Sequence, residues 1–131
     1  MIFVGLYGYG KSGVYTGQPA FDDIIQGQSG LASLYQLGKK DPLFVPSVIA
    51  DKTIGLLAST ALLAAYIKVL KKGEGSCVEI SMFEGMVSYV LLEHQYGQIF
   101  FPNRGKTGYP RLLSKNRRPY KTKNGYICIL P

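Results

Sequence analysis

Asp51 is the side chain whose type and position best suit covalent chemistry. It follows the apolar run at residues 45–50 and opens a long apolar stretch with helical period. The positive end of a helix dipole favours the ionised form of a carboxylate, which would make Asp51 a charged nucleophile in an apolar pocket. Gly55, one turn later, would leave space for a bulky substrate. The position also suits a plain N-cap that accepts the N–H of Thr53 or Ile54, and spacing does not decide between the two roles.

Asp22 and Asp23 are adjacent acids that could act as a pair. They precede Ile24 and Ile25, and aspartate is favoured where a helix starts, so a short helix is the favoured interpretation. His94 and the two cysteines, Cys77 and Cys128, give weaker signals. The histidine is expected at the surface near a helix end, and the isolated cysteines predict no disulfide and no metal site.

A glycine-rich stretch follows the first apolar run. Residues 5–12 satisfy the letters of a phosphate loop, and residues 8–13 satisfy GxGxxG. Both motifs need a helix to begin at once, so that its free N–H groups point at phosphate. Gly13, Gly17 and Pro19 prevent that here, and we expect a turn-rich loop at the end of a strand. A nucleotide-binding loop stays the alternative.

Alternating strands and helices must position these residues, which predicts a mixed α/β fold. Gly73 is expected to stop the main helix, and Asn124-Gly125 to form the two-residue turn of the hairpin. The expected elements are a buried strand at 2–7, a short helix from 22, a turn at 38–42, a helix at 51–72 buried on most sides, a strand at 77–81, a helix at 82–98 and a hairpin at 120–129.

The positive charge is confined to the end of the chain. The 131 residues carry a net charge of +7, yet residues 1–101 hold seven basic residues and eight acids, and residues 102–131 hold eight basic residues and no acid. This basic tail could hold the phosphates of a nucleic acid or of a cofactor such as CoA, or it could be a solvated loop. A nucleic-acid-binding module therefore remains an alternative function.

The sequence predicts a soluble, cytoplasmic protein. No positively charged segment precedes the first apolar run, so no signal peptide is expected. The longest uncharged helical stretch, residues 53–67, is shorter than the roughly 20 residues needed to cross a bilayer. We therefore expect no membrane association.

Several strings follow one another in a distinctive order. They are GYGKSGVY at 8–15, PAFDDIIQ at 19–26, SGL at 29–31, VIAD at 48–51, GEGSCVEISMFE at 73–84, RRPY at 117–120 and NGYI at 124–127. In this order and spacing they resemble the central part of a family III CoA-transferase, and the resemblance spans nearly the whole chain. Members are about three times as long, so the chain looks like a central fragment.

The resemblance implies a fold and a chemistry. Residues 1–101 would be part of a Rossmann-like large domain, and residues 102–131 the linker and start of the small domain. The position that matches the catalytic aspartate is Asp51, which would carry CoA from an acyl-CoA to a free carboxylic acid through an anhydride and an aspartyl thioester. Coenzyme A is then a co-substrate and no metal is needed.

The family also implies contacts and partners. The segment that lies against CoA matches Pro19, Ala20, Phe21 and Asp22, and full-length members form interlocked homodimers. Neither nucleic acid nor membrane is an expected partner. The racemase branch of the family has a proton-transferring histidine where this chain has Phe21, which argues against racemisation.

Overall fold

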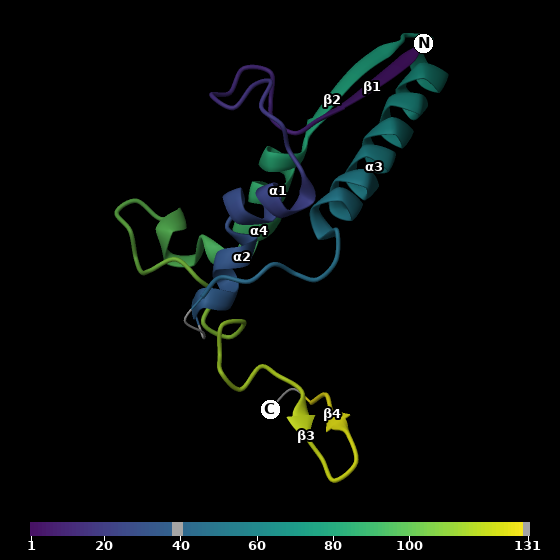
Figure 1. The fold of residues 1–131 in the computed structure, drawn as a ribbon. Coiled ribbons are helices and arrows are strands. Elements are labelled where there is room, and N and C mark those ends of the chain that lie inside the picture. Colours follow the sequence, from purple (N-terminus) through teal and green to yellow (C-terminus); the bar gives the residue numbers. More distant parts are fainter. Residues whose placement is uncertain (38–40, 130–131) are drawn as a thin grey trace.

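The computed structural model describes residues 1–37 and 41–129, and a parallel pair of strands lies at one end of it (Figure 1). Strand β1 (Ile2–Tyr7) pairs with β2 (Ser76–Ser81) in a register that runs from Ile2 opposite Ser76 to Tyr7 opposite Ser81. Parallel strands need a crossover connection, and helix α3 (Ile49–Lys72) supplies its last and longest part. Figure 1 shows α3 alongside the two strands. The predicted α/β class is confirmed.

The remaining elements are short. They are α1 (Asp22–Gln28), α2 (Leu31–Leu34) and the 3-10 turn η1 (Tyr35–Leu37) before α3, then α4 (Met82–His94), the 3-10 turn η2 (Tyr96–Ile99), and the hairpin strands β3 (Tyr120–Lys121) and β4 (Tyr126–Ile127). After η2 the chain turns back to the end of α4, where Gly108 and Tyr109 bond to His94, and in Figure 1 it then runs away from the helices to the separate hairpin. A domain boundary near residue 102 stays a prediction. Residues 38–40 of the predicted turn lie outside the described residues.

The core lies where α1, α3 and α4 meet the end of the strand pair. It consists of Tyr9, Ile25, Ala50, Ile54, Ala58, Ile80, Met86 and Val90. A glycine sets the spacing between two of these helices, because a Cβ on Gly85 of α4 would lie 2.5 Å from Cδ1 of Ile54 on α3. The two helices therefore pack at a distance that a larger residue at position 85 would not allow.

Helix α3 forms and ends as the sequence predicts. Gly73 adopts a left-handed φ of 71°, and its N–H donates to the carbonyl of Val69 at 2.8 Å. The expectation that α3 is buried on most sides is wrong for this chain. Its buried residues are Ala50, Ile54, Ala58 and Ala65, whereas Leu56 is 72% exposed and Leu70 is 67% exposed. One face of α3 packs on the core, and the opposite face is apolar and open.

By length and composition alone, α3 is able to cross a membrane. It has 24 residues, since it extends well beyond the uncharged stretch at 53–67, and an 18-residue window within it has a mean hydropathy of 1.8. The core helices of soluble proteins pass the same test. In this chain α3 contacts both strands as well as α1 and α4, which is the position of a crossover helix in an α/β unit.

Three local expectations need correction. Strand β1 forms over the predicted residues, but it is not buried, since Phe3 and Leu6 are each more than half exposed. Helix α4, which was expected to reach residue 98, ends at His94, and the backbone then turns through a positive φ at Tyr96. The hairpin begins at Tyr120 as predicted, but its two-residue turn lies one residue earlier, because Lys121 pairs with Tyr126 and the N–H of Thr122 donates to the carbonyl of Gly125 at 2.9 Å.

The turn of that hairpin also differs in type. A type I′ turn at Asn124-Gly125 would need positive φ at both residues. In the described part of the chain, positive φ occurs at Gly17, Gly30, Gly73, Gly108 and Tyr96. The hairpin therefore closes around Lys123 and Asn124 with a different backbone geometry.

Candidate active site

Asp51 lies in the first turn of α3, as its third residue. The helix begins at Ile49 with Val48 at the N-cap, so the interpretation of Asp51 as an N-cap is wrong. Its side chain is exposed, and no hydrogen bond or ion pair joins its carboxylate to the described residues. Its backbone N–H donates to Oδ2 of Asp22 at 3.0 Å. The carboxylate is thus open to a ligand while the backbone beneath it is held.

Asp22 lies in the first turn of α1 and is only 7% exposed. Besides the N–H of Asp51 on Oδ2, its Oδ1 accepts the side-chain amide of Gln26 at 2.6 Å. Helix α1 begins at Asp22, as the sequence predicts, but its N-cap is Phe21, so neither Asp22 nor Asp23 caps its own helix. The two candidate acids, Asp22 and Asp51, are 29 residues apart in the sequence and are joined by one hydrogen bond in the structure.

Gln26 is a site residue that the sequence analysis missed. Its side chain is fully buried, and its Oε1 accepts the N–H of Val45 at 2.8 Å. Its Nε2, besides donating to Asp22, lies 3.4 Å from the carbonyl of Val45 and 3.3 Å from that of Ser47. Gln26 therefore ties α1 to the segment that leads into α3. Gln26 follows two isoleucines and precedes a glycine, and this short stretch shows no pattern of apolar and polar residues that would predict a buried polar side chain.

The segment before Asp22 lies between the strand end and solvent. Ala20 packs against Gly8, where an added Cβ would come within 2.2 Å of the Ala20 Cβ. Phe21 is 69% exposed. Pro19 lines a cleft of about 430 Å³ whose other walls are Tyr9, Val14, Tyr15, Gln18, Ile24 and Gln28. Of the four residues predicted to contact CoA, Pro19 and Phe21 are exposed and Ala20 is half-buried, whereas Asp22, which bonds to Asp51, is buried.

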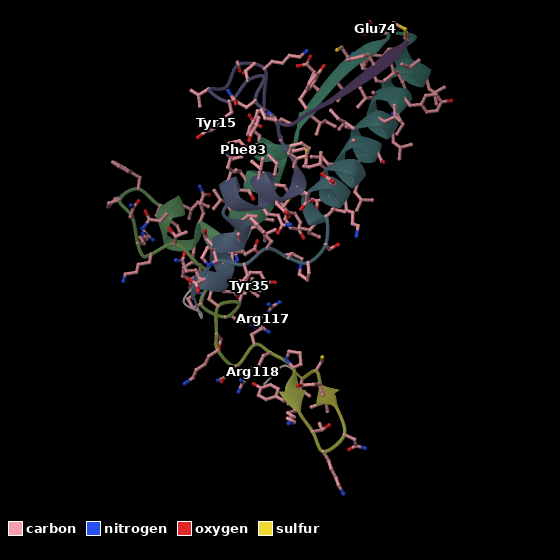
Figure 2. All side chains as sticks on the ribbon, in the orientation of Figure 1. Tyr15, Tyr35, Glu74, Phe83, Arg117 and Arg118 are labelled. Atoms are coloured by element: carbon pink, nitrogen blue, oxygen red, sulfur yellow. The ribbon has the colours of Figure 1, made fainter. Side chains whose placement is uncertain are left out.

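Three aromatic rings form one wall of this region. The centroids of Tyr9 and Tyr15 are 5.3 Å apart, and Phe83 lies 5.9 Å from Tyr9 and 6.1 Å from Tyr15. Figure 2 labels Tyr15 and Phe83 close together, and their rings meet edge to face. The hydroxyl of buried Tyr9 donates to Oε1 of Gln28 at 2.6 Å. These contacts join the loop to α1 and α4.

The glycine-rich loop does not open a helix, and the predicted turn-rich loop at the end of β1 is confirmed. Residues 8–21 form turns and irregular backbone until α1 begins. The N–H of Gly10 donates to Oε1 of Glu84 at 3.0 Å, and a Cβ on Gly10 would meet that same oxygen at 2.6 Å. The hydroxyl of Thr16 contacts the carbonyls of Gly10 and Gly13 at 2.8 and 2.6 Å. The loop is therefore held in one conformation.

Glu84 is kept ionised by its hydrogen bonds. Partial desolvation raises the pKa of this carboxyl, but the Ser81 hydroxyl and the backbone N–H groups of Glu84 and Gly10 bond to it and lower the pKa below its ordinary value of 4.5 overall. Lys11, on the same loop, pairs with Glu79 of β2, and this hydrogen bond raises the pKa of the lysine above 10.5. Two charged groups thus fasten the loop to β2 and α4.

His94 is buried, which contradicts the expected surface position. It is 4% exposed, its Nδ1 accepts the N–H of Tyr109 at 3.2 Å, and its carbonyl accepts the N–H of Gly108 at 2.7 Å. It lines a second cavity of about 300 Å³ together with Val90 and Thr107. Its contacts fasten the irregular segment after η2 to the C-terminal end of α4, and none of them involves Asp22 or Asp51.

The basic tail is exposed throughout its charged residues. Arg104 lies over the ring of Phe100 at 5.0 Å and Arg118 over that of Tyr120 at 5.9 Å. In Figure 2, Arg117 and Arg118 lie well away from Tyr15 and Phe83. Within the described residues, no three His, Cys, Asp or Glu side chains gather as metal ligands, and Cys77 and Cys128 are free and exposed.

Comparisons with known proteins point to one family. The sequence model of CoA-transferase family III matches residues 1–131. The chain is 34% identical over 139 residues to the L-carnitine CoA-transferases of Proteus sp. (strain LE138) and Proteus mirabilis (strain HI4320), covering 98% of this chain and 32% of either relative. The chain thus spans about a third of the length of the curated relatives it matches.

Solved structures share the fold. A CAIB/BAIF family protein from Brucella suis matches with a TM-score of 0.76 and 21% identity over 96% of this chain and 33% of that one. A hypothetical protein from Mycobacterium tuberculosis matches with a TM-score of 0.69 and 22% identity over 98% of this chain and 33% of that one. At these identities the likeness concerns the arrangement of the backbone.

Proposed function

The chain belongs to CoA-transferase family III, and on that premise we propose that it carries the nucleophile of an enzyme that moves CoA from an acyl-CoA thioester to a free carboxylic acid. The nucleophile is Asp51. The observation that carries this assignment is an exposed, unengaged carboxylate in the first turn of a 24-residue helix, joined through its backbone to the segment at residues 19–22.

The proposed reaction proceeds through two anhydrides. The Asp51 carboxylate attacks the donor thioester carbon and expels CoA thiolate, which leaves an acyl-aspartyl anhydride. The thiolate then attacks the aspartyl carbonyl, so that the donor acid leaves and an aspartyl-CoA thioester remains. The acceptor carboxylate attacks this thioester in turn, and the returning thiolate cleaves the second anhydride at the acceptor carbonyl. Each step exchanges one acyl bond for another, and Asp51 is regenerated.

The position of Asp51 supports the first step. The N-terminus of α3 presents partial positive charge, which stabilises a bare carboxylate without a cationic side chain that would have to be displaced. The exposure of Asp51 leaves it free to reach a thioester carbon. CoA would lie along Pro19, Ala20 and Phe21, since Phe21 is exposed and Pro19 lines the adjacent cleft. Phe21 has no ionisable group, so racemisation by proton transfer at this position is not part of the proposal.

The open face of α3 supports a partner. Large apolar side chains such as Leu56 and Leu70 are exposed along it, and a contiguous apolar face of this kind is usually covered by protein. An interlocked homodimer, in the cytoplasm, is the assembly we propose. Nucleic-acid binding by the basic tail is not favoured, because the family match also covers residues 102–131.

Chemical trapping tests the proposal. The protein, purified as the polypeptide its host makes, is incubated with an acyl-CoA and then with hydroxylamine, which converts an aspartyl anhydride or thioester to a hydroxamate. We expect peptide mass spectrometry to find the hydroxamate at Asp51 and inactivation to require acyl-CoA. Asp23→Ala, which removes a neighbouring exposed acid, is the matched control and should be trapped like the wild type. Full transfer activity in Asp51→Ala would overturn the assignment.

A further inference from the structure

Helix α3 begins without a cap of its own. The first N–H groups of a helix have no partner within it, and a side-chain oxygen at the N-cap usually accepts one of them. Here the N-cap is Val48, whose apolar side chain has no acceptor. The N–H of Asp51, the third helical residue, is instead bound by Oδ2 of Asp22 at 3.0 Å. The cap of α3 thus comes from another helix.

Asp22 is committed to this contact. Its side chain is buried, with 7% of the residue exposed. Its other oxygen accepts the side-chain amide of Gln26, which is fully buried and in turn accepts the N–H of Val45. A buried carboxylate is costly unless hydrogen bonds satisfy it, and both oxygens of Asp22 are satisfied within the protein. Little of this side chain remains for a ligand to touch.

The position of the cap matters because of what Asp51 carries. The amide that Asp22 holds and the carboxylate proposed to attack the thioester belong to the same residue. Fraying of the first turn of α3 would move both together, and displacement of a reacting group by about 1 Å can cost a hundredfold in rate. A bond from Asp22 to the Asp51 amide therefore restricts where the nucleophile can point.

We infer that Asp22 is a positioning residue, which caps α3 at the Asp51 amide and so orients the nucleophilic carboxylate, and that it does not contact CoA through its side chain. This inference rests on the proposed function. It refines the role that family resemblance suggests for Asp22, from a group in the CoA-contacting segment to the support of the catalytic residue. Pro19, Ala20 and Phe21 keep their place in that segment.

Steady-state kinetics separate the two roles. In the protein purified as its host makes it, Asp22→Ala should lower kcat about 10- to 100-fold and leave KM for acyl-CoA within about twofold, because substrate binding survives and orientation is lost. Asp23→Ala, at the exposed neighbouring acid, should leave both constants within about twofold. A rise in KM at unchanged kcat would show that Asp22 binds CoA and would overturn the inference.

A second substitution tests the cap itself. Val48→Asp places an acceptor at the N-cap position, from which it can reach the N–H of the second or third helical residue. In the Asp22→Ala background, Val48→Asp should raise kcat at least tenfold above that of Asp22→Ala alone. No recovery, in a protein whose far-UV circular dichroism shows the helix content of the wild type, would overturn the inference. If Asp22→Ala does not fold, Asp22→Asn serves in its place, since it keeps one oxygen and loses the other acceptor.

Amide hydrogen exchange gives a readout that needs no activity. The Asp51 amide should exchange at least tenfold faster in Asp22→Ala than in the wild type, whereas the amides beyond the first turn of α3 should be unchanged. Unchanged protection at Asp51 would overturn the inference even if the trapping experiment succeeds. If the Asp51 amide exchanges faster in Asp22→Ala, but no hydroxamate forms at Asp51 in the wild type, then Asp22 does cap α3 and the proposed function is rejected.

Discussion

The two sides of α3 differ in the polarity of the groups that lie on them and in whether the chain covers them. Where α1 meets the start of α3, the buried polar groups Asp22 and Gln26 bind the backbone at Val45 and Asp51. On the opposite side, apolar side chains such as Leu56 and Leu70 are exposed. The polar junction is complete within the chain, whereas the apolar face has no cover among the described residues. Orientation at the site is therefore a local property, and stability of the outer face depends on what covers it.

Asp51→Ala should have the largest effect at the junction, because it should abolish transfer activity while leaving the stability of the fold nearly unchanged. Transfer activity should fall on the order of 10³-fold or more, because the covalent route loses its nucleophile. The free energy of unfolding should change by no more than about 0.5 kcal/mol, since the lost carboxylate is exposed. An activity assay and urea unfolding of the same preparation check both. A large loss of stability would mean that the carboxylate helps to hold the junction together.

Two substitutions on α3 compare its faces directly. Ile54 is 3% exposed and Leu56 is 72% exposed, two residues apart on one helix. In the monomeric chain, Ile54→Ala should cost about 2–4 kcal/mol of unfolding free energy through the cavity it leaves, and Leu56→Ala, whose side chain is uncovered there, less than about 0.5 kcal/mol. Urea unfolding measures each. If Leu56→Ala costs as much as Ile54→Ala, another protein surface packs on the outer face in solution, as the proposed dimer requires.

Gln26→Leu should destabilise the junction by about 2 kcal/mol, even though the apolar replacement has a similar volume. The buried N–H of Val45 and one oxygen of Asp22 would lose their partner, and unpaired buried polar groups are costly. Gln18→Leu, at an exposed glutamine, is the matched control and should be near neutral. Equal unfolding midpoints for the two variants would mean that water replaces the buried amide.

Glu84→Gln should give the smallest effect, which depends on pH. The pKa of Glu84 is lowered in the folded protein, so its ionised form stabilises the fold above the unfolded-state pKa, and this contribution is lost as pH falls through the folded-state pKa. Because Glu84 is exposed, we expect only a few tenths of a kcal/mol at pH 7. Urea unfolding at pH 7 and pH 3 checks this. A difference that grows on acidification would contradict it.

Local patterns predicted the elements well. Strand β1 covers the predicted residues, and α3 ends at the predicted glycine, because side-chain period and the φ of glycine act over a few residues. The family strings also pointed to Asp51 and Asp22 as members of one site, and the structure joins them. Their roles as site residues stay predictions until the trapping and kinetic experiments are done.

Tertiary contacts account for what the sequence could not predict. Helix α3 begins at Ile49 and not at the predicted residue 51, and its cap comes from Asp22, which is remote in the sequence. His94 is buried because residues 108 and 109 fold back over it. Burial on most sides of α3 was predicted from its composition alone, but composition does not say whether the covering surface lies within the same stretch of chain.

The bonds that Glu84 and Thr16 make to the glycine-rich loop have a consequence for affinity. Loops rich in glycine usually lose much conformational freedom when a ligand arrives, and that loss weakens binding. Here Gly10 and Gly13 are bonded to Glu84 and Thr16, and the same loop carries Val14 and Tyr15, which line the cleft beside Pro19. Part of that freedom was therefore given up during folding, so a molecule that enters the cleft has less of the loop left to order.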